Sequence, residues 1–165
     1  MAWLTCVGVM AFTGSAAQNI DGMLSQADGL FKQGMTEDAK LVYEKIARLD
    51  TTCHTSTVWL GNYYFLKGEE KRKQVERAYH TLPNPNRMQS ANYQEQLKAV
   101  CQAYYLKADT LVKRALRQQQ NDQLLSIASS IEAYKIRLGL AKPSVKKKPP
   151  VIKLFRSFRD STALL

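Results

Sequence analysis

The sequence predicts an all-α fold in which short helical hairpins are stacked as repeats. Three observations support this fold class. Apolar residues recur at helical spacing through most of the chain between residues 20 and 138. The residue pattern of positions 27–34 returns after 34 positions and again after a further 40. Glycine and proline interrupt the helical pattern, which is typical of connections between helices.

The first predicted hairpin covers residues 20–49. Its first helix ends at Gly34, a residue type that favours helix termination. Thr36 starts the second helix, and Glu37 and Asp38 suit its first turn, where unpaired amides and the helix dipole favour negative charge. The apolar positions of the two helices are Ile20, Met23, Leu24, Ala27, Leu30, Phe31, Ala39, Val42, Tyr43, Ile46 and Leu49.

The second predicted hairpin follows from internal self-similarity. An offset of 34 residues places Gly34 on Gly68 and aligns the apolar positions that precede each glycine. This alignment predicts a helix over residues 57–67, a turn at Gly68 and a second helix over residues 69–82.

A third copy of the pattern is weaker. An offset of 40 residues aligns residues 64–68 with residues 104–108, and the loop over residues 83–86, with its two prolines, supplies the extra length. Ala108 stands where the earlier copies have glycine and need not end a helix. One long helix over residues 89–118 is therefore the alternative to a third hairpin.

The best-preserved motif has the form Leu-Gly-x-x-Tyr-x-x-x-Gly and consists of Leu60, Gly61, Tyr64 and Gly68. It resembles the first helix of a tetratricopeptide repeat (TPR) and the turn after it, and the 34-residue period matches that family. Lys73 and Arg77 depart from the pattern, because a small residue and an aromatic are usual at their positions. The resemblance implies a TPR-like α-solenoid of about three repeats, with the apolar segment 122–138 as a C-terminal capping helix.

Residues 1–17 carry no charge and contain an apolar run from Ala2 to Phe12 that is followed by small residues. This composition predicts a secretory signal peptide with cleavage after Ala17, and hence an exported protein of the periplasm or cell envelope. The basic start of an ordinary signal peptide is missing, so an apolar N-terminal helix is the alternative. The repeat domain is predicted to cover residues 18–140.

The composition changes in residues 141–165. The net charge of the whole chain is +10, and the stretch from Lys142 to Asp160 alone has seven basic residues against one acid. Its prolines and lysines predict a disordered tail. Such a tail acts as a tether, contacts an anionic surface or folds on a partner. A role on nucleic acid requires the signal peptide prediction to be wrong.

The chain has no recognisable catalytic or metal-binding constellation. It lacks a phosphate-binding glycine loop, a nucleophile elbow and a dinucleotide fingerprint. The pair Cys53 and His54 supplies only two of the four ligands of a structural zinc site. The sequence therefore predicts a protein that is not an enzyme and has no metal or cofactor. Cys53 and Cys101 either pair, as export would permit, or remain buried thiols.

The TPR resemblance also implies a binding mode, in which the first helix of each repeat lines a concave groove that holds a peptide or a partner helix. The protein would then be an interaction adaptor, and Phe31, Phe65 and Tyr105 would form an aromatic row unless they are ordinary core residues. The alternative function is a surface-associated binder that uses the basic tail on anionic membrane or nucleic acid. The implied groove residues are Leu24, Asp28, Phe31, Val58, Asn62, Phe65, Lys98, Gln102 and Tyr105.

Overall fold

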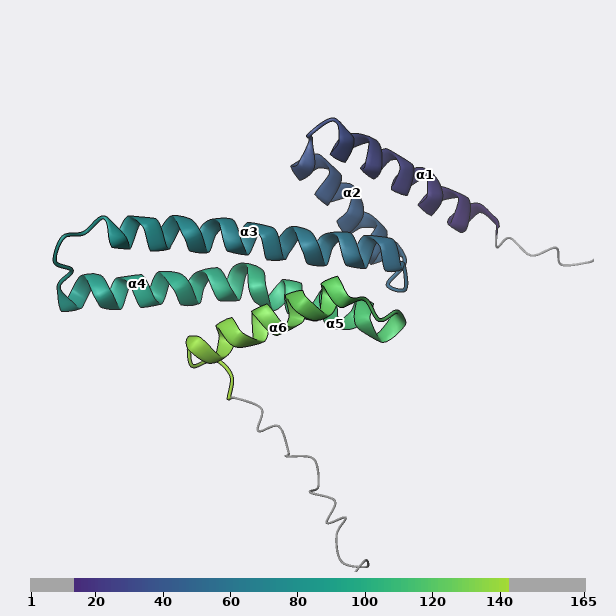
Figure 1. The fold of residues 1–165 in the computed structure, drawn as a ribbon. Coiled ribbons are helices and arrows are strands. Elements are labelled where there is room, and N and C mark those ends of the chain that lie inside the picture. Colours follow the sequence, from purple (N-terminus) through teal and green to yellow (C-terminus); the bar gives the residue numbers. More distant parts are fainter. Residues whose placement is uncertain (1–13, 143–165) are drawn as a thin grey trace, which may run out of the picture.

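The computed structural model describes residues 14–142, which form five helical rods (Figure 1). The first three rods are α1 (Gly14–Lys32), α2 (Thr36–Leu49) and α3 (His54–His80). The fourth consists of α4 (Arg87–Val100), the π-helix η1 (Cys101–Tyr105) and α5 (Leu106–Gln118), and the fifth is α6 (Asp122–Arg137). Residues 14–142 contain no strand, so the all-α prediction is confirmed.

The helices α1 and α2 form the short hairpin that the sequence predicts (Figure 1). Gly34 has a φ of 80°, a left-handed conformation that glycine adopts without strain. The amide of Met35 donates to the carbonyl of Leu30 at 3.0 Å, and the amide of Gly34 donates to the carbonyl of Phe31 at 3.0 Å. These two bonds close α1 as a Schellman motif. The predicted turn at Gly34 is therefore confirmed.

Helix α3 has 27 residues and continues without interruption through Gly68. The predicted turn at Gly68 and the separate helix over residues 69–82 are therefore wrong. Gly68 is buried, and a Cβ placed there would lie 3.2 Å from the Cβ of Tyr104 and 3.2 Å from the ring of Tyr105. The missing side chain lets η1 approach α3 closely. Glycine inside a helix costs about 1 kcal/mol, which this packing offsets.

The chain returns from α3 into the long rod, which lies beside it in the opposite direction (Figure 1). Asn86 and Gln89 start the rod with a capping box, in which each side chain accepts from the other residue's amide at 2.8 Å. The rod continues to Gln118, so the alternative of one long helix is confirmed. Inside the rod the amide of Leu106 donates to the carbonyl of Cys101, which forms a π turn. The extra residue in this turn rotates the side chains of α5 about the helix axis relative to those of α4.

Two apolar clusters hold the helices together. The first lies between α1, α2 and the start of α3, and its buried residues are Met23, Ala27, Ala39, Tyr43, Ile46 and Leu60. The second lies between α3, the long rod and α6, and its buried residues are Leu97, Cys101, Tyr105, Ala108, Val112, Ala115, Leu124, Ile127, Ile131 and Leu138. Tyr64 packs against both clusters. Helix α3 is therefore the element that joins them.

The predicted helix over residues 122–138 is present as α6, and it packs on α5. Gly139 ends it with a φ of 70° and the same pair of closing bonds as at the end of α1. The described helices thus form one short hairpin, one long hairpin and an added helix. They do not divide into three hairpins of equal length.

The predicted N-terminal and C-terminal segments fall mostly outside the described residues. The expected cleavage position after Ala17 lies within α1, which begins at Gly14. The greater part of the predicted signal peptide and of the basic tail lies in residues 1–13 and 143–165, which are not described. Among the helices of residues 14–142, none combines the length and the apolar character that crossing a membrane requires.

Candidate binding surface

An apolar hollow of about 370 Å³ lies between the α1–α2 connection and α3, and we call it the aromatic hollow. Its walls are formed by Phe31, Thr36, Trp59, Asn62, Tyr63 and Leu66, with Lys67 and Glu70 at one end. Phe31 is 49% exposed and Leu66 is 65% exposed. Large apolar side chains that gather around a hollow and remain in contact with water are typical of a binding site.

Trp59 contacts three other aromatic rings beside the aromatic hollow. Its ring stacks on that of buried Tyr43, with centroids 4.3 Å apart and planes at 22°, and on that of Tyr63 at 5.5 Å and 10°. Phe31 meets Trp59 edge-on, at 5.7 Å and 88°. Because Tyr43 belongs to the first cluster, the stack fixes the floor of the hollow to the core. The rings therefore lose little freedom when a partner binds.

Polar groups surround the Lys67 end of the hollow. The hydroxyl of Tyr63 donates to Oε2 of Glu37 at 2.6 Å, and Nζ of Lys67 lies 3.4 Å from the carboxylates of both Glu37 and Glu70. The hydrogen bond from Tyr63 and the charge of Lys67 hold the pKa of Glu37 below its ordinary value. Burial, with the bond to Glu37, raises the pKa of Tyr63. At neutral pH Glu37 and Lys67 are therefore charged, while Tyr63 is neutral.

Two of the nine predicted groove residues, Phe31 and Asn62, line the aromatic hollow. The Oδ1 atom of Asn62 is buried and has no hydrogen-bond partner within residues 14–142. Leu24 is half-buried against the first cluster, and Asp28 accepts a hydrogen bond from the hydroxyl of Tyr43. Leu24 and Asp28 thus support the core beside the hollow, without lining it.

The other five predicted groove residues lie elsewhere. Val58 and Phe65 pack against the second cluster, and Tyr105 is inside that cluster with 1% exposure. The rings of Phe65 and Tyr105 meet at 6.1 Å and 71°. Lys98 on α4 and Gln102 on η1 are exposed and do not line the hollow. The expected aromatic row is therefore not one surface: Tyr105 is a core residue, and Phe65 is half-buried against the same cluster.

Trp59, Tyr63 and Leu66 line the aromatic hollow although the repeat pattern did not indicate them. They follow one another at spacings of four and three residues, which places them on one face of α3. That spacing was a usable signal for an apolar helical face. It could not show whether the face is covered, because this depends on how α1 and α2 lie against α3.

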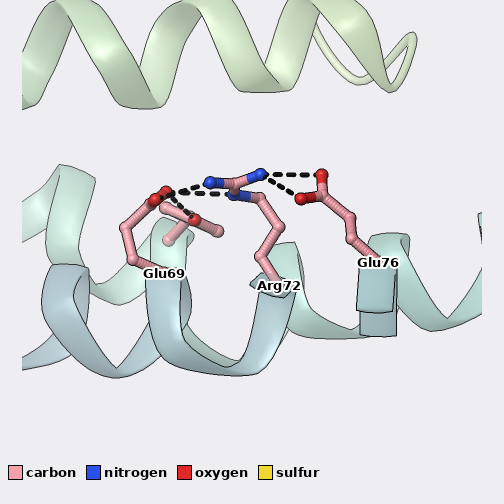
Figure 2. Close-up of polar contacts among 4 residues, drawn as sticks. Glu69, Arg72 and Glu76 are labelled. Atoms are coloured by element: carbon pink, nitrogen blue, oxygen red, sulfur yellow. Dashed lines mark hydrogen bonds and ion pairs between the residues drawn. The ribbon is translucent and has the colours of Figure 1, made fainter. Parts of the chain in front are cut away.

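A charged network on α3 supports the second cluster (Figure 2). Arg72 lies between Glu69 and Glu76 and donates to Glu69 at 2.7 Å and to Glu76 at 2.6 Å. The bonds from Arg72 hold the pKa of Glu69 below its ordinary value. Glu69 also accepts from the hydroxyl of Tyr105, and the Arg72 guanidinium lies 5.9 Å from the ring of Tyr134. The network ties α3 to η1 and α6.

The two described cysteines are free thiols that lie far apart. Cys53 precedes α3, where Nδ1 of His54 lies 2.9 Å from Oε1 of Gln118 at the end of α5. Cys101 lies 17 residues before Gln118 in the same rod, roughly 25 Å away at the helical rise. A disulfide needs Cα atoms within about 7 Å, so the pairing alternative is wrong. Residues 14–142 contain no group of three or more potential metal ligands among His, Cys, Asp and Glu.

Comparison with known proteins shows that a solved structure shares this helical arrangement. No protein-family profile and no curated protein matches the chain. A crystal structure of a protein from Bacteroides ovatus ATCC 8483, which carries the provisional name protein binding protein, is similar, with 27% sequence identity and a TM-score of 0.71. The similarity covers 74% of this chain and 60% of that one. The chain thus spans about three-fifths of the length of its structural neighbour.

Proposed function

We propose that this protein is a non-enzymatic protein-interaction adaptor that binds an extended peptide or a partner helix in the aromatic hollow. The observation that carries the proposal is the solvent-exposed aromatic surface around Trp59, with Phe31 and Leu66 open to water. The name of the structural neighbour refers to protein binding, which supports a partner of the same class.

The chemistry of the aromatic hollow suits a polypeptide. Apolar side chains of the partner would displace water from Phe31, Trp59 and Leu66, and rings already held by stacking lose little entropy on binding. The buried Oδ1 of Asn62 lacks a donor, and a buried acceptor without a partner costs about 1–3 kcal/mol. A backbone amide of a bound peptide would supply that donor.

We also propose, on sequence grounds, that the protein is a TPR-like helical repeat of the cell envelope. The α1–α2 hairpin supports the repeat relationship. So does Gly61, where an added Cβ would lie 3.1 Å from Cγ2 of Val112, because the TPR motif has a small residue at the helix crossing. Export rests on the uncharged segment of residues 1–17. N-terminal sequencing of exported protein tests it, and cytosolic protein that keeps Met1 would contradict it.

A matched pair of surface variants tests the binding proposal. The partner is first captured with the full chain from an envelope extract, identified and purified. Isothermal titration calorimetry then compares wild type with the double variant Phe31→Ala, Leu66→Lys. We expect at least tenfold weaker binding, because both residues are exposed and their loss removes apolar contacts at the centre of the interface. Equal affinity would contradict the proposal.

Met88→Lys is the matched control for these variants. Met88 is 75% exposed on α4 and lies outside the aromatic hollow, so its replacement should leave the affinity within about twofold. Deletion of residues 141–165 distinguishes the proposed function from the alternative, in which the basic tail makes the contact. If binding survives the double variant but is lost on deletion, the basic tail provides the contact and the aromatic hollow does not.

A further inference from the structure

A second hollow, of about 420 Å³, adjoins the aromatic hollow, and we call it the lysine hollow. The two hollows share Tyr63 and Lys67. The lysine hollow lies between α2, α3 and the η1–α5 part of the long rod, and its walls include Lys40 from α2, Lys71 from α3 and Lys107 from α5. One extended segment could therefore pass from one hollow into the other.

The lysine hollow has a surplus of positive charge. Lys40 and Lys67 each have a carboxylate within 3.6 Å. Nζ of Lys71, by contrast, contacts only the amide oxygen of Gln74 at 3.2 Å. Nζ of Lys107 lies over the ring of Tyr64, 5.3 Å from the ring centroid. In the part of the chain that the structure describes, neither Lys71 nor Lys107 has a carboxylate at ion-pair distance. Two cations from two different helices are thus free to bind an anion.

The π turn of η1 lies beside the lysine hollow, because Tyr104 within η1 and Lys107 just after it line the hollow. Gly68 lets η1 approach α3 closely, since a Cβ added there would lie only 3.2 Å from the Cβ of Tyr104. Tyr104 and Lys107 line the same hollow as Lys67 and Lys71. The hydroxyl of Tyr104 forms no hydrogen bond with residues 14–142 and is a further donor. Single π turns inside α-helices are frequent at functional sites.

We propose that the lysine hollow binds side-chain carboxylates of the partner segment whose apolar residues occupy the aromatic hollow. This inference rests on the proposed function and specifies the partner as an acidic segment in which glutamate or aspartate lies within a few residues of the apolar anchors. Lys71 and Lys107 would attract the carboxylates of the segment. Because the two hollows share Tyr63 and Lys67, the acidic residues and the apolar residues of the segment would lie close together in its sequence.

Two capped peptides test this inference. Each peptide has two apolar residues followed by two residues that differ between the peptides. These two residues are glutamates in the first peptide and glutamines in the second. Because both peptides are capped, every negative charge comes from a glutamate side chain. Binding to the full chain is followed by amide chemical shifts up to about 1 mM peptide, where weak binding is visible. We expect the glutamate peptide to bind at least fivefold more tightly and to shift the amides of Lys71 and Lys107.

The double variant Lys71→Gln, Lys107→Gln should reduce that preference to near onefold. The control Lys45→Gln, Lys73→Gln removes the same charge from exposed positions outside the lysine hollow and should preserve the preference. Equal binding of both peptides to wild type, or no binding of the glutamate peptide, would overturn the inference. If both peptides bind wild type equally and Leu66→Lys abolishes the binding of both, the inference is overturned while the proposed function stays intact.

Inorganic phosphate and vesicles that contain phosphatidylglycerol are the competing probes. Either probe should leave the amides of Lys71 and Lys107 unshifted at concentrations where the glutamate peptide shifts them. If phosphate or vesicles shift these amides and the glutamate peptide does not, the hollow recognises a phosphate group and the carboxylate proposal is wrong.

Discussion

Gly34 and Gly68 occupy equivalent positions in the 34-residue pattern, yet the two glycines have opposite roles. Gly34 lies between α1 and α2 with a φ of 80°, and nothing lies within 4 Å of the place where a Cβ would be. Gly68 lies in the middle of α3, where Tyr104 and Tyr105 fill the space that a Cβ would need. The first glycine is required by its backbone conformation and the second by its packing.

The comparison extends to the regions around the two glycines. The α1–α2 hairpin is short, and its helices end where local capping signals predict. The α3 hairpin is long, because η1 packs against Gly68 and the Glu69–Arg72–Glu76 network supports the helix beyond it. Similar local sequence thus produces a turn where nothing packs on the glycine and a continuous helix where another helix does. The predictions below test this difference between the two regions, from the largest expected effect to the smallest.

Removal of one buried tyrosine from each cluster tests whether the two regions unfold together. Tyr43→Ala and Tyr105→Ala should each lower the free energy of unfolding by about 3–5 kcal/mol, because each removes a fully buried ring. Urea unfolding is followed by the fluorescence of Trp59, in a Trp3→Phe background, and by far-ultraviolet circular dichroism. The two probes should give one midpoint, since α3 enters both clusters. Two separate midpoints would show that the clusters unfold independently.

A side chain at Gly68 tests the packing role. Gly68→Val should lower the free energy of unfolding by about 1–3 kcal/mol, because the added atoms would overlap Tyr104 and Tyr105. Gly29→Ala is the control, since Gly29 is helical and has nothing within 4 Å of its added Cβ. It should raise the free energy of unfolding by about 0.5–1 kcal/mol. If Gly68→Val leaves the free energy of unfolding unchanged, η1 does not pack closely on α3.

A side chain at Gly34 tests the conformational role. Gly34→Ala should lower the free energy of unfolding by about 1–2 kcal/mol, because alanine is strained at a φ of 80° although the space around it is empty. Gly34→Asn should cost less, since asparagine tolerates the left-handed conformation. Urea denaturation of the three proteins measures this order. Equal effects of alanine and asparagine would contradict a conformational origin.

The smallest effect is expected from the charged network on α3. The pKa of Glu69 is lower in the folded protein than its ordinary value of 4.5, chiefly through the hydrogen bonds from Arg72. The folded state therefore binds this proton less tightly than the unfolded state, so the stabilisation is present above about pH 4.5 and is lost as the pH falls further. Each helical ion pair contributes about 0.2–0.5 kcal/mol.

Glu69→Gln tests this pH dependence. Urea unfolding between pH 7 and pH 3 should show a smaller loss of stability on acidification in the variant than in wild type. Glu37→Gln is the comparison, because Glu37 also has a lowered pKa but lies in the first region. If Glu69→Gln leaves the acid dependence unchanged, the network does not stabilise the second region.

Much of the fold could be predicted because its signals are local. Gly34, the acids after Thr36 and the apolar spacing of residues 122–138 act within one or two helical turns. These signals predict helix starts and ends whatever the rest of the chain does. The continuity of α3 could not be predicted in this way, because the reason for Gly68 lies about 36 residues later, in Tyr104 and Tyr105.

The candidate surface was predictable only in part for the same reason. Phe31 and Asn62 were indicated by the family resemblance, and both line the aromatic hollow. Tyr105 and Phe65 were indicated by the same pattern, but Tyr105 lies in the second cluster and Phe65 packs against it, because the uninterrupted α3 pairs with the long rod. Which face of an amphipathic helix is covered depends on its neighbours, and the helical period alone does not contain that information.

The sequence by itself determined that the protein is helical, that its first hairpin turns at Gly34 and that residues 122–138 form a further helix after the long rod. Local backbone preferences and helical periodicity are sufficient for these features. Only the tertiary structure decided that α3 continues through Gly68, that Cys53 and Cys101 lie apart, and that two hollows adjoin at Tyr63 and Lys67. These features arise from contacts between residues distant in the chain, where one missing Cβ at Gly68 lets two helices approach.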